Sequence, residues 1–302
     1  MVRWFDRVPS SVWALSTVLV WASLAPLGVS VKHLPPFLIT GCGLIVGGAL
    51  ALPQILKQQL WRLDAATWII GIYGLFGYHA LLFAALQLAP PVAANLINYL
   101  WPMGIVVLAA WLIPGVRWNW GHAGAALLGF AGSAIAILGN HSIEAPQPSE
   151  WLGYGFALTA AFIWSTYSLL TKRRAHVPTG AIGALCLVAG SLSLVMHWLF
   201  EVRPTLGNSE VMVLLLLGLG PVGGAFFLWD LALKKGDARQ VGLWAFLTPV
   251  LSTGALAWQS GQALQWQWVA ATVLVVASAA LGRWAGADSN GPEHAAVSRV
   301  SE

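Results

Sequence analysis

Charged residues are scarce in this chain and make up 9% of its 302 residues, against about 25% in an ordinary soluble domain. Hydrophobic residues reach 58%, and the mean hydropathy is +0.73. A soluble protein of this length could not hide so much apolar surface from water. The composition therefore excludes an ordinary soluble enzyme and indicates an integral membrane protein.

Cysteine is nearly absent, and neither of the two residues carries a recognisable chemistry. Cys42 and Cys186 each lie inside an apolar stretch, where we expect them to be small buried side chains. No CxxC or Cys/His spacing suggests a metal site, and no phosphate-binding glycine loop, HExxH or GxSxG motif occurs. His79 has no evident serine partner for an intramembrane protease. We therefore expect no cofactor, no metal and no enzymatic activity.

Carboxylates are missing from the middle of the apolar stretches, and Asp230 lies near the end of its stretch. Proton- or sodium-coupled antiporters usually place an acidic residue at mid-membrane, and a carrier of cationic drugs needs one to pair with its substrate. A carrier of sugar phosphates would need buried lysine or arginine, which is also missing. A neutral or zwitterionic substrate remains.

Ten apolar stretches follow one another along the chain, each long enough to cross about 30 Å of hydrocarbon as a helix. The first is too long for the core of a signal peptide and is kept as a span. The spans fall near residues 11–31, 35–54, 66–88, 91–112, 119–139, 151–171, 179–200, 210–232, 240–258 and 266–284.

Positive charge is sorted between the segments that separate these spans. Counted from the N-terminus, the even-numbered segments carry only Lys32 and Arg203. The odd-numbered segments carry Arg3, Arg7, Lys57, Arg62, Arg117, Lys172, Arg173, Arg174, Lys234, Lys235, Arg239, Arg283 and Arg299. Because cytoplasmic loops carry the excess of Lys and Arg, this bias places both termini in the cytoplasm and makes the number of spans even.

The two halves of the chain resemble each other. Trp21 aligns with Trp164, Pro102 with Pro249, and the pair Trp118 and Trp120 with Trp266 and Trp268, at offsets of 143, 147 and 148 residues. Two halves of five spans each have opposite orientations, so the duplication predicts an inverted repeat. The predicted fold is an all-α membrane protein of ten transmembrane helices in two inverted five-helix repeats, residues 10–139 and 150–285. A disordered cytoplasmic tail is expected over residues 286–302.

This arrangement, with a proline late in the fourth and ninth spans, resembles the drug/metabolite transporter superfamily, EamA type, over residues ~10–285. Within it, the stretch Asn95–Pro102 (NLINYLWP) and the pair Tyr78 and His79 are most similar to the aromatic amino-acid exporters. The resemblance implies efflux of phenylalanine, tyrosine, tryptophan and other neutral amino acids through the cell inner membrane. The direction of transport comes from the resemblance alone.

The fourth span holds the most informative residues. Asn95, Asn98 and Pro102 share one helix face, and Tyr99 and Trp101 flank it. Amide side chains in hydrocarbon are costly unless they are paired. The two asparagines therefore indicate either hydrogen bonds between helices or a water-filled cavity. We favour the cavity, because aromatic residues and a helix-breaking proline lie on the same turns.

Two further groups are candidate substrate contacts. His79 lies inside the third span beside Tyr78, where it could hydrogen-bond a substrate carboxylate, titrate, or simply bond a neighbouring carbonyl. Trp21 and Trp164 lie near the middle of the spans that open each half, where they could wall a cavity and stack on an aromatic substrate. Tyr167 shares the face of Trp164.

Three residues are candidates for gating or coupling. Asp230 precedes Lys234 by four residues, which is also an ordinary structural pairing on a helix. Pro102 and Pro249 interrupt corresponding spans. Glycines in the third and eighth spans permit either close packing or movement of helices; they are Gly71, Gly74, Gly77, Gly218, Gly220, Gly223 and Gly224.

The sequence thus predicts a carrier that exports aromatic and other neutral amino acids by facilitated alternating access. Its predicted substrate-binding residues are Trp21, Tyr78, His79, Asn95, Asn98, Tyr99, Trp101, Trp164 and Tyr167. The alternative is a proton-coupled exporter of drugs or other small metabolites, and a channel would instead show steady ion conductance. The expected partners are the substrate and the lipid bilayer. A nucleic acid is not expected, because no basic run is long enough to grip a phosphate backbone.

Overall fold

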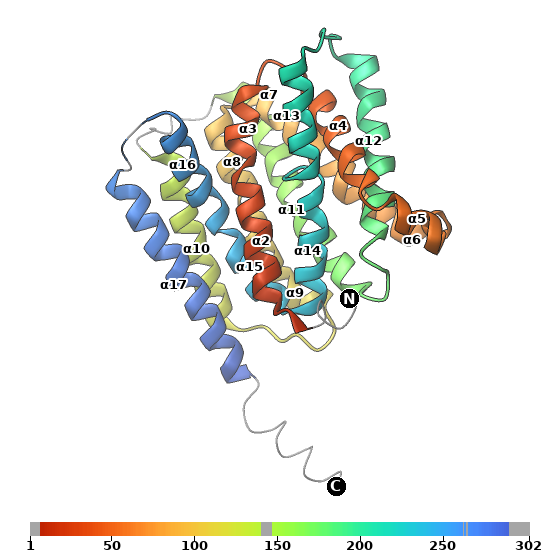
Figure 1. Ribbon diagram of the computed structural model, residues 1–302. Coiled ribbons are helices and arrows are strands. Elements are labelled where there is room, and N and C mark those ends of the chain that lie inside the picture. Colours follow the sequence, from red (N-terminus) through yellow and green to blue (C-terminus); the bar gives the residue numbers. More distant parts are fainter. Residues whose placement is uncertain (1–6, 140–146, 262, 264, 290–302) are drawn as a thin grey trace.

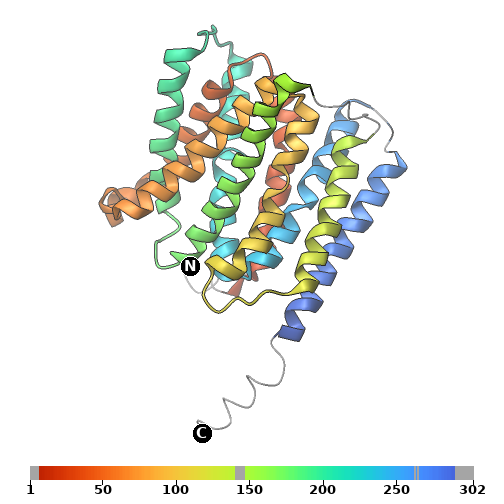
Figure 2. The same cartoon turned by 180° about the vertical axis from the view of Figure 1, so that it is seen from behind.

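The computed structural model describes residues 7–139, 147–261, 263 and 265–289, and every regular element within these ranges is helical. The first half contains α2 (Ser10–Ala22), α3 (Leu24–Ser30), α4 (Pro36–Ala49), α5 (Leu52–Gln58), η1 (Leu60–Arg62), α6 (Ala65–Gly71), η2 (Ile72–Gly77), α7 (Tyr78–Leu88), α8 (Pro91–Asn98), α9 (Trp101–Leu112) and α10 (Trp120–Leu138). The second half contains η3 (Pro148–Glu150), α11 (Trp151–Arg173), α12 (Ala181–Phe200), α13 (Asn208–Leu219), α14 (Gly224–Lys235), α15 (Ala238–Ala245), α16 (Leu247–Gln259) and α17 (Trp266–Ser289). Figures 1 and 2 show the bundle from opposite sides, with α10 and α17 side by side at its edge.

The expected spans coincide closely with these helices. Eight helical stretches are long and apolar enough to cross a membrane, and the bent pair α4 and α5, with an angle of 58° between its halves, raises the number to nine. The chain is therefore a multi-pass membrane protein by the length and composition of its helices. The last helix continues to Ser289, past the expected boundary at residue 285, and residues 290–302 of the expected tail lie outside the described residues.

Helix α11, which covers the expected span 151–171, is not among the nine. It carries Ser165, Thr166, Tyr167 and Ser168 on consecutive positions, and all four are buried. It packs against α7, α8, α9 and α14, so other helices surround much of its length. A helix enclosed in this way can be less apolar than one that faces lipid. A count of ten spans and the inverted repeat remain predictions.

Besides the bent pair α4 and α5, several spans are interrupted. Pro102 has no N–H to donate to the carbonyl of Asn98, and α8 ends at Asn98. Likewise, Pro249 has no N–H to donate to the carbonyl of Ala245, and α15 ends at Ala245. The third span contains the π-helical stretch η2, and the eighth is broken between Leu219 and Gly224. Such interruptions occur in membrane helices where neighbouring protein groups surround the exposed backbone.

Close helix contacts are made at glycines. A Cβ added to Gly47 on α4 would lie 2.3 Å from the Cα of Gly223, and one added to Gly74 would lie 2.1 Å from the ring of Tyr167. These positions leave no room for a side chain. Glycine therefore allows α4 to approach the α13–α14 break and η2 to approach α11.

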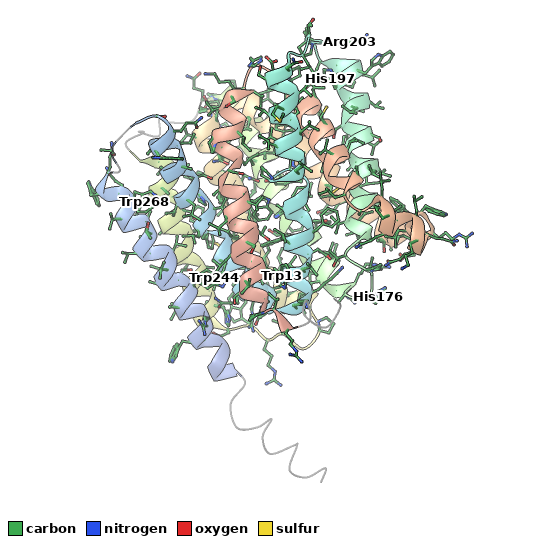
Figure 3. The ribbon with its side chains drawn as sticks, viewed as in Figure 1. Trp13, His176, His197, Arg203, Trp244 and Trp268 are labelled. Atoms are coloured by element: carbon green, nitrogen blue, oxygen red, sulfur yellow. The ribbon has the colours of Figure 1, made fainter. Side chains whose placement is uncertain are left out.

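Polar contacts between the segments that join the helices mark one end of the bundle. Gly236 meets Lys172, Arg239 reaches the carbonyl of Arg117, and Arg174 pairs with Asp64. Segments that carry the excess of positive charge thus meet at one end, where Figure 3 labels His176, whereas Arg203 lies at the opposite end. The grouping agrees with the charge sorting in the sequence. The orientation in the membrane remains a prediction.

Candidate functional site

A cavity of about 690 Å³ lies inside the bundle, within the roughly 300–1,000 Å³ typical of small-molecule sites. Of the nine predicted substrate-binding residues, eight line it: Trp21, Tyr78, His79, Asn95, Asn98, Tyr99, Trp101 and Trp164. Residues far apart in the sequence therefore share one space. Their role in binding remains a prediction.

Most of the exposed lining residues lie where α3 ends and α8 begins, and we take this end as the mouth of the cavity; Leu24, at the start of α3, is also exposed. The exposed residues Val29, Lys32 and Pro91 belong to its lining there. Lys32 is the only charged residue among the lining residues that the structure describes. The cavity therefore suits a ligand without net charge, or one that carries a carboxylate toward its mouth.

Three indoles form the inner end of the cavity. The ring centroids of Trp21, Trp101 and Trp164 lie 5.9, 6.1 and 6.3 Å apart, in edge-to-face arrangements, which aromatic pairs favour. Trp229 packs behind them, with its ring 5.1 Å from Trp21 and 5.5 Å from Trp101. Its indole N–H donates to the hydroxyl of Ser168 over 3.1 Å. A two-layer tryptophan floor thus separates the cavity from the far end of the bundle.

The α7 and α8 walls are joined by one hydrogen bond. The side-chain amide of Asn98 donates to the hydroxyl of Tyr78 over 3.2 Å, and the ring of Tyr78 lies 4.9 Å from that of Trp164. The side-chain oxygen of Asn98 has no hydrogen-bond partner among the described residues. Asn98 therefore forms a hydrogen bond between helices and also lines the cavity. These were given as alternatives in the sequence analysis.

His79 projects from α7 directly after the π-helical stretch η2. Its Nδ1 lies 2.6 Å from the carbonyl oxygen of Leu75, and its ring lies 5.0 Å from Tyr78 and 6.2 Å from Phe226. Single π-helical turns are frequent at functional sites. The contact with Leu75 is the hydrogen bond to a neighbouring carbonyl that the sequence analysis gave as one possibility for His79. The other ring nitrogen, Nε2, has no partner among the described residues.

The cavity lining also holds residues that the sequence reasoning missed. Helix α16 contributes Thr248, Ser252 and Thr253, and α14 contributes Phe226. Thr248 precedes Pro249 as Trp101 precedes Pro102, so the predicted internal repeat would have pointed to it. Phe226 has no such signal, because one phenylalanine in an apolar span is ordinary.

The remaining predicted residues are distributed as follows. Tyr167 is buried outside the cavity lining, with its ring 5.3 Å from Trp164 and against Gly74. Pro249 lines the cavity, whereas Pro102 is buried in the first turn of α9.

Asp230 lies away from the cavity. One of its carboxylate oxygens is 2.6 Å from Lys234 Nζ and accepts from the hydroxyl of Thr179, also over 2.6 Å. The other oxygen has no partner among the described residues. Asp230 is thus an ion-paired residue beyond the tryptophan floor, near a small hollow that Arg174 also lines.

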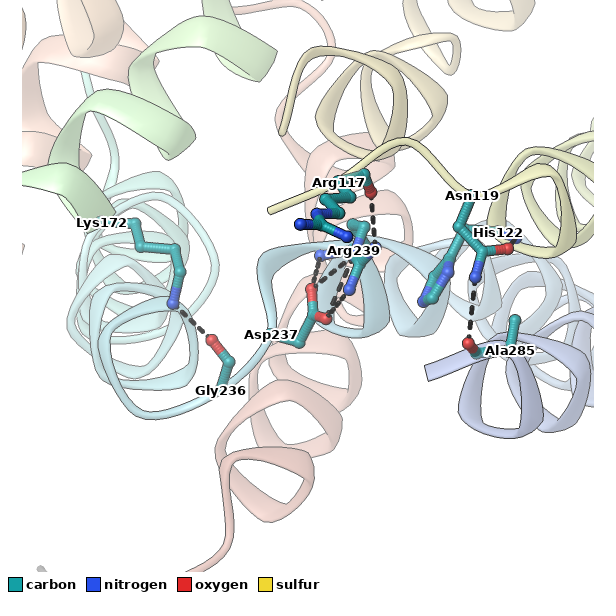
Figure 4. A network of polar contacts seen from close by, with 8 residues as sticks. All are labelled: Arg117, Asn119, His122, Lys172, Gly236, Asp237, Arg239 and Ala285. Atoms are coloured by element: carbon teal, nitrogen blue, oxygen red, sulfur yellow. Dashed lines mark hydrogen bonds and ion pairs between the residues drawn. The ribbon is translucent and has the colours of Figure 1, made fainter. Parts of the chain in front are cut away.

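A network of polar contacts closes the end of the bundle opposite the mouth (Figure 4). Lys172 donates to the carbonyls of Leu233, over 2.8 Å, and Gly236. Arg239 binds both carboxylate oxygens of Asp237 and donates to the carbonyl of Arg117 over 3.3 Å. Burial alone raises the pKa of Asp237, but the hydrogen bonds and charge of Arg239 outweigh it and lower that pKa.

Comparison with known proteins identifies the relatives of the chain. A model of the EamA-like transporter family matches residues 9–138 and 151–282. The chain is 38% identical over 252 residues to the aromatic amino acid exporter YddG of Ancylobacter novellus, covering 82% of this chain and 88% of that one. It is 24% identical over 263 residues to the protein of the same name from Escherichia coli, covering 83% and 88%. A solved crystal structure matches with a TM-score of 0.85 at 37% identity, over 90% of this chain and 95% of the other.

Proposed function

The chain belongs to the EamA-like transporter family, and we propose that it exports aromatic and other neutral amino acids from the cytoplasm through the inner membrane. Family membership makes it a transporter rather than an enzyme. The outward direction and the aromatic substrates follow the names of two relatives. The residues of the cavity supply an independent argument.

The observation that carries the proposal is the composition of the cavity. Its inner end is made of indole rings, and its walls carry amide, hydroxyl and imidazole groups. No carboxylate occurs among the described lining residues. Tryptophan faces suit an aromatic side chain, and uncharged polar groups suit a zwitterion, whose net charge is zero. A cavity for organic cations that have no N–H to donate, such as quaternary or phosphonium ions, would be expected to contain an acidic residue.

The proposal includes ten spans in two inverted repeats. The two matched segments, 9–138 and 151–282, coincide with the predicted halves. The helix breaks also correspond, since α8 and α15 end 147 residues apart, at Asn98 and Ala245, before Pro102 and Pro249. With the predicted orientation the mouth faces away from the cytoplasm, and the network around Lys172 and Arg239 closes the cytoplasmic end.

Transport then proceeds by facilitated alternating access. The substrate binds between the tryptophan floor and the polar walls, and movement of one group of helices against the other exposes the site to either side. The two prolines interrupt helices where such a movement can bend them. Asp230, in its ion pair with Lys234, belongs to the cytoplasmic closure, so its proposed part is in gating.

The proposal is tested by uptake of radiolabelled tryptophan, threonine and tetraphenylphosphonium into proteoliposomes, with and without an imposed proton gradient. Saturable tryptophan uptake that ignores the gradient is expected. Uptake of the cation that follows the gradient would instead establish the proton-coupled drug exporter, and a steady ion conductance would establish a channel.

A pair of variants tests the position of the site. Trp101→Ala opens the floor of the cavity and is expected to lower tryptophan uptake by about tenfold or more. Trp111→Ala is the matched control, because that side chain is 73% exposed on the outer face of the bundle. Equal uptake by the two folded variants would remove Trp101 from the site.

A further inference from the structure

The contact between His79 and Leu75 fixes the hydrogen-bonding role of the imidazole. A carbonyl oxygen only accepts hydrogen bonds, so at 2.6 Å the Nδ1 atom of His79 is the donor. A neutral imidazole has one N–H, and the other ring nitrogen then carries a lone pair. His79 therefore presents Nε2 as an acceptor, provided that the ring is neutral.

The surroundings of His79 favour the neutral ring. It lies within a membrane-spanning segment, and its ring neighbours are the aromatic rings of Tyr78, Phe83 and Phe226, at 5.0, 6.2 and 6.2 Å. No carboxylate occurs among the described residues that line the cavity. A charged imidazole would have no counter-ion there, and a charge inside a membrane is costly without one, whereas a zwitterionic substrate carries its own carboxylate.

A lone pair on a ring with aromatic neighbours suits a cation rather than a carboxylate. A carboxylate oxygen and Nε2 would both be acceptors, so they could not form a hydrogen bond with each other. An ammonium group can donate a hydrogen bond to Nε2. Ring faces attract a cation within about 6 Å of their centroids. A substrate carboxylate was considered in the sequence analysis as a hydrogen-bond partner of His79. The hydrogen bond to Leu75 argues against that partner.

We propose that His79 receives the α-ammonium group of the amino-acid substrate, through Nε2 and beside the adjacent aromatic rings. The aromatic side chain of the substrate then lies on Trp21 and Trp101, and its carboxylate points toward the mouth, where Lys32 supplies the one positive charge of the lining. The inference rests on the proposed transport of amino acids. It adds the requirement that a substrate carry a hydrogen-bond donor at its amino position.

The test compares three ligands that share a phenyl ring in proteoliposomes of the purified protein. Phenylalanine carries both charged groups, phenethylamine lacks the carboxylate, and 3-phenylpropionate lacks the ammonium. None of the rings has an N–H or O–H, so only the ammonium can donate to His79. Phenethylamine is expected to compete for phenylalanine uptake at a concentration about tenfold or more below that of 3-phenylpropionate.

Variants of His79 connect this preference to the imidazole. His79→Phe keeps a ring but removes the acceptor, and it is expected to raise KM for phenylalanine about tenfold and abolish the preference. His79→Gln supplies an amide oxygen and is expected to keep the preference for the amine. His33→Phe is the control, because His33 is an exposed residue that pairs with Glu210 and does not line the cavity.

The results separate two failures. Absence of phenylalanine uptake by the wild-type protein would refute the proposed function. Uptake with equal competition by the amine and the acid, or an unchanged preference in His79→Phe, would refute the role of His79 and leave the proposed function intact.

Discussion

The hydroxyl of Ser165 on α11 donates to the carbonyl oxygen of Trp101 on α9 over 2.8 Å and shares its proton with the carbonyl of Ala161 on its own helix, 2.7 Å away. The contact fixes the backbone of one tryptophan of the cavity floor against the helix that carries another, Trp164. It is possible because Gly104 leaves space for Ser165, since a Cβ there would lie 2.2 Å from the serine oxygen. The position of the floor thus depends on a residue with no side chain.

Gly104→Ala is therefore expected to displace Ser165 and lower stability by about 1–3 kcal/mol. It should also raise KM for tryptophan, since the floor moves. Thermal unfolding in detergent and proteoliposome uptake measure the two effects. Gly124→Ala is the matched control, because its added methyl group meets nothing within 4 Å. Equal melting temperatures for the two variants would contradict the expectation.

The polar closure gives a second prediction. Lys172→Met removes the donor to the carbonyls of Leu233 and Gly236 at the end of α14. Weaker closure should make that end of the bundle open more often.

The opening is measured as the rate at which a membrane-impermeant maleimide labels Thr171→Cys, in a protein whose Cys42 and Cys186 have been replaced. Thr171 lines the small hollow at this end of the bundle. Labelling from the side that carries Arg117 is expected to become several times faster in Lys172→Met. The control is Lys57→Met, at an exposed lysine, which should leave the labelling rate unchanged. If Lys172→Met is labelled no faster than Lys57→Met, Lys172 does not hold the closure.

The ion pair between Asp237 and Arg239 gives a prediction on pH. Despite burial, Arg239 lowers the pKa of Asp237 below its ordinary value, which is about 3.9 in an unfolded chain. A lowered folded-state pKa means that the stabilisation is complete above the unfolded value and is lost as the pH falls through the folded value. The pair should therefore stabilise the protein fully at neutral pH and less with each step below about pH 4.

Asp237→Asn isolates this charge, because asparagine can still cap α15 through the N–H of Arg239. The melting temperature of Asp237→Asn should lie below that of the wild type at pH 7 and approach it toward pH 3. Asp64→Asn is the control, since that aspartate caps α6 and pairs with Arg174 at an exposed site, where ion pairs contribute little. A constant difference in melting temperature across the pH range would exclude the ion pair as its cause.

Most of the expected spans coincide with helices long enough to cross a membrane, and eight of the nine predicted substrate-binding residues line one cavity, because both patterns are local. Apolar length gives the spans, and the spacing of Asn95 and Asn98 places both on the cavity lining, whereas Pro102, expected on the same face, is buried away from it. Phe226 and Trp229 were missed, since their positions depend on the break before α14. Tyr167 shares a helix face with Trp164 but packs on Gly74, which periodicity within one helix does not reveal.

The break before α14 leads to the last prediction. A Cβ added to Gly223 would lie 2.3 Å from the carbonyl oxygen of Gly218 and 2.5 Å from the Cα of Gly47, and these are backbone atoms that cannot rotate away. Gly223→Ala should therefore destabilise the protein by more than the ~1–3 kcal/mol usual for overpacking. Gly155→Ala, with nothing within 4 Å of its added methyl group, is the control.

If Gly223→Ala still folds, its defect should reach the cavity, because the same break sets the direction in which α14 carries Phe226 to the lining. The expected result is a lower melting temperature together with a raised KM for tryptophan. A variant with normal stability and normal uptake would show that α4 and α14 can separate without cost. In that case the close approach of Gly47 and Gly223 would not be what holds this wall of the cavity in place.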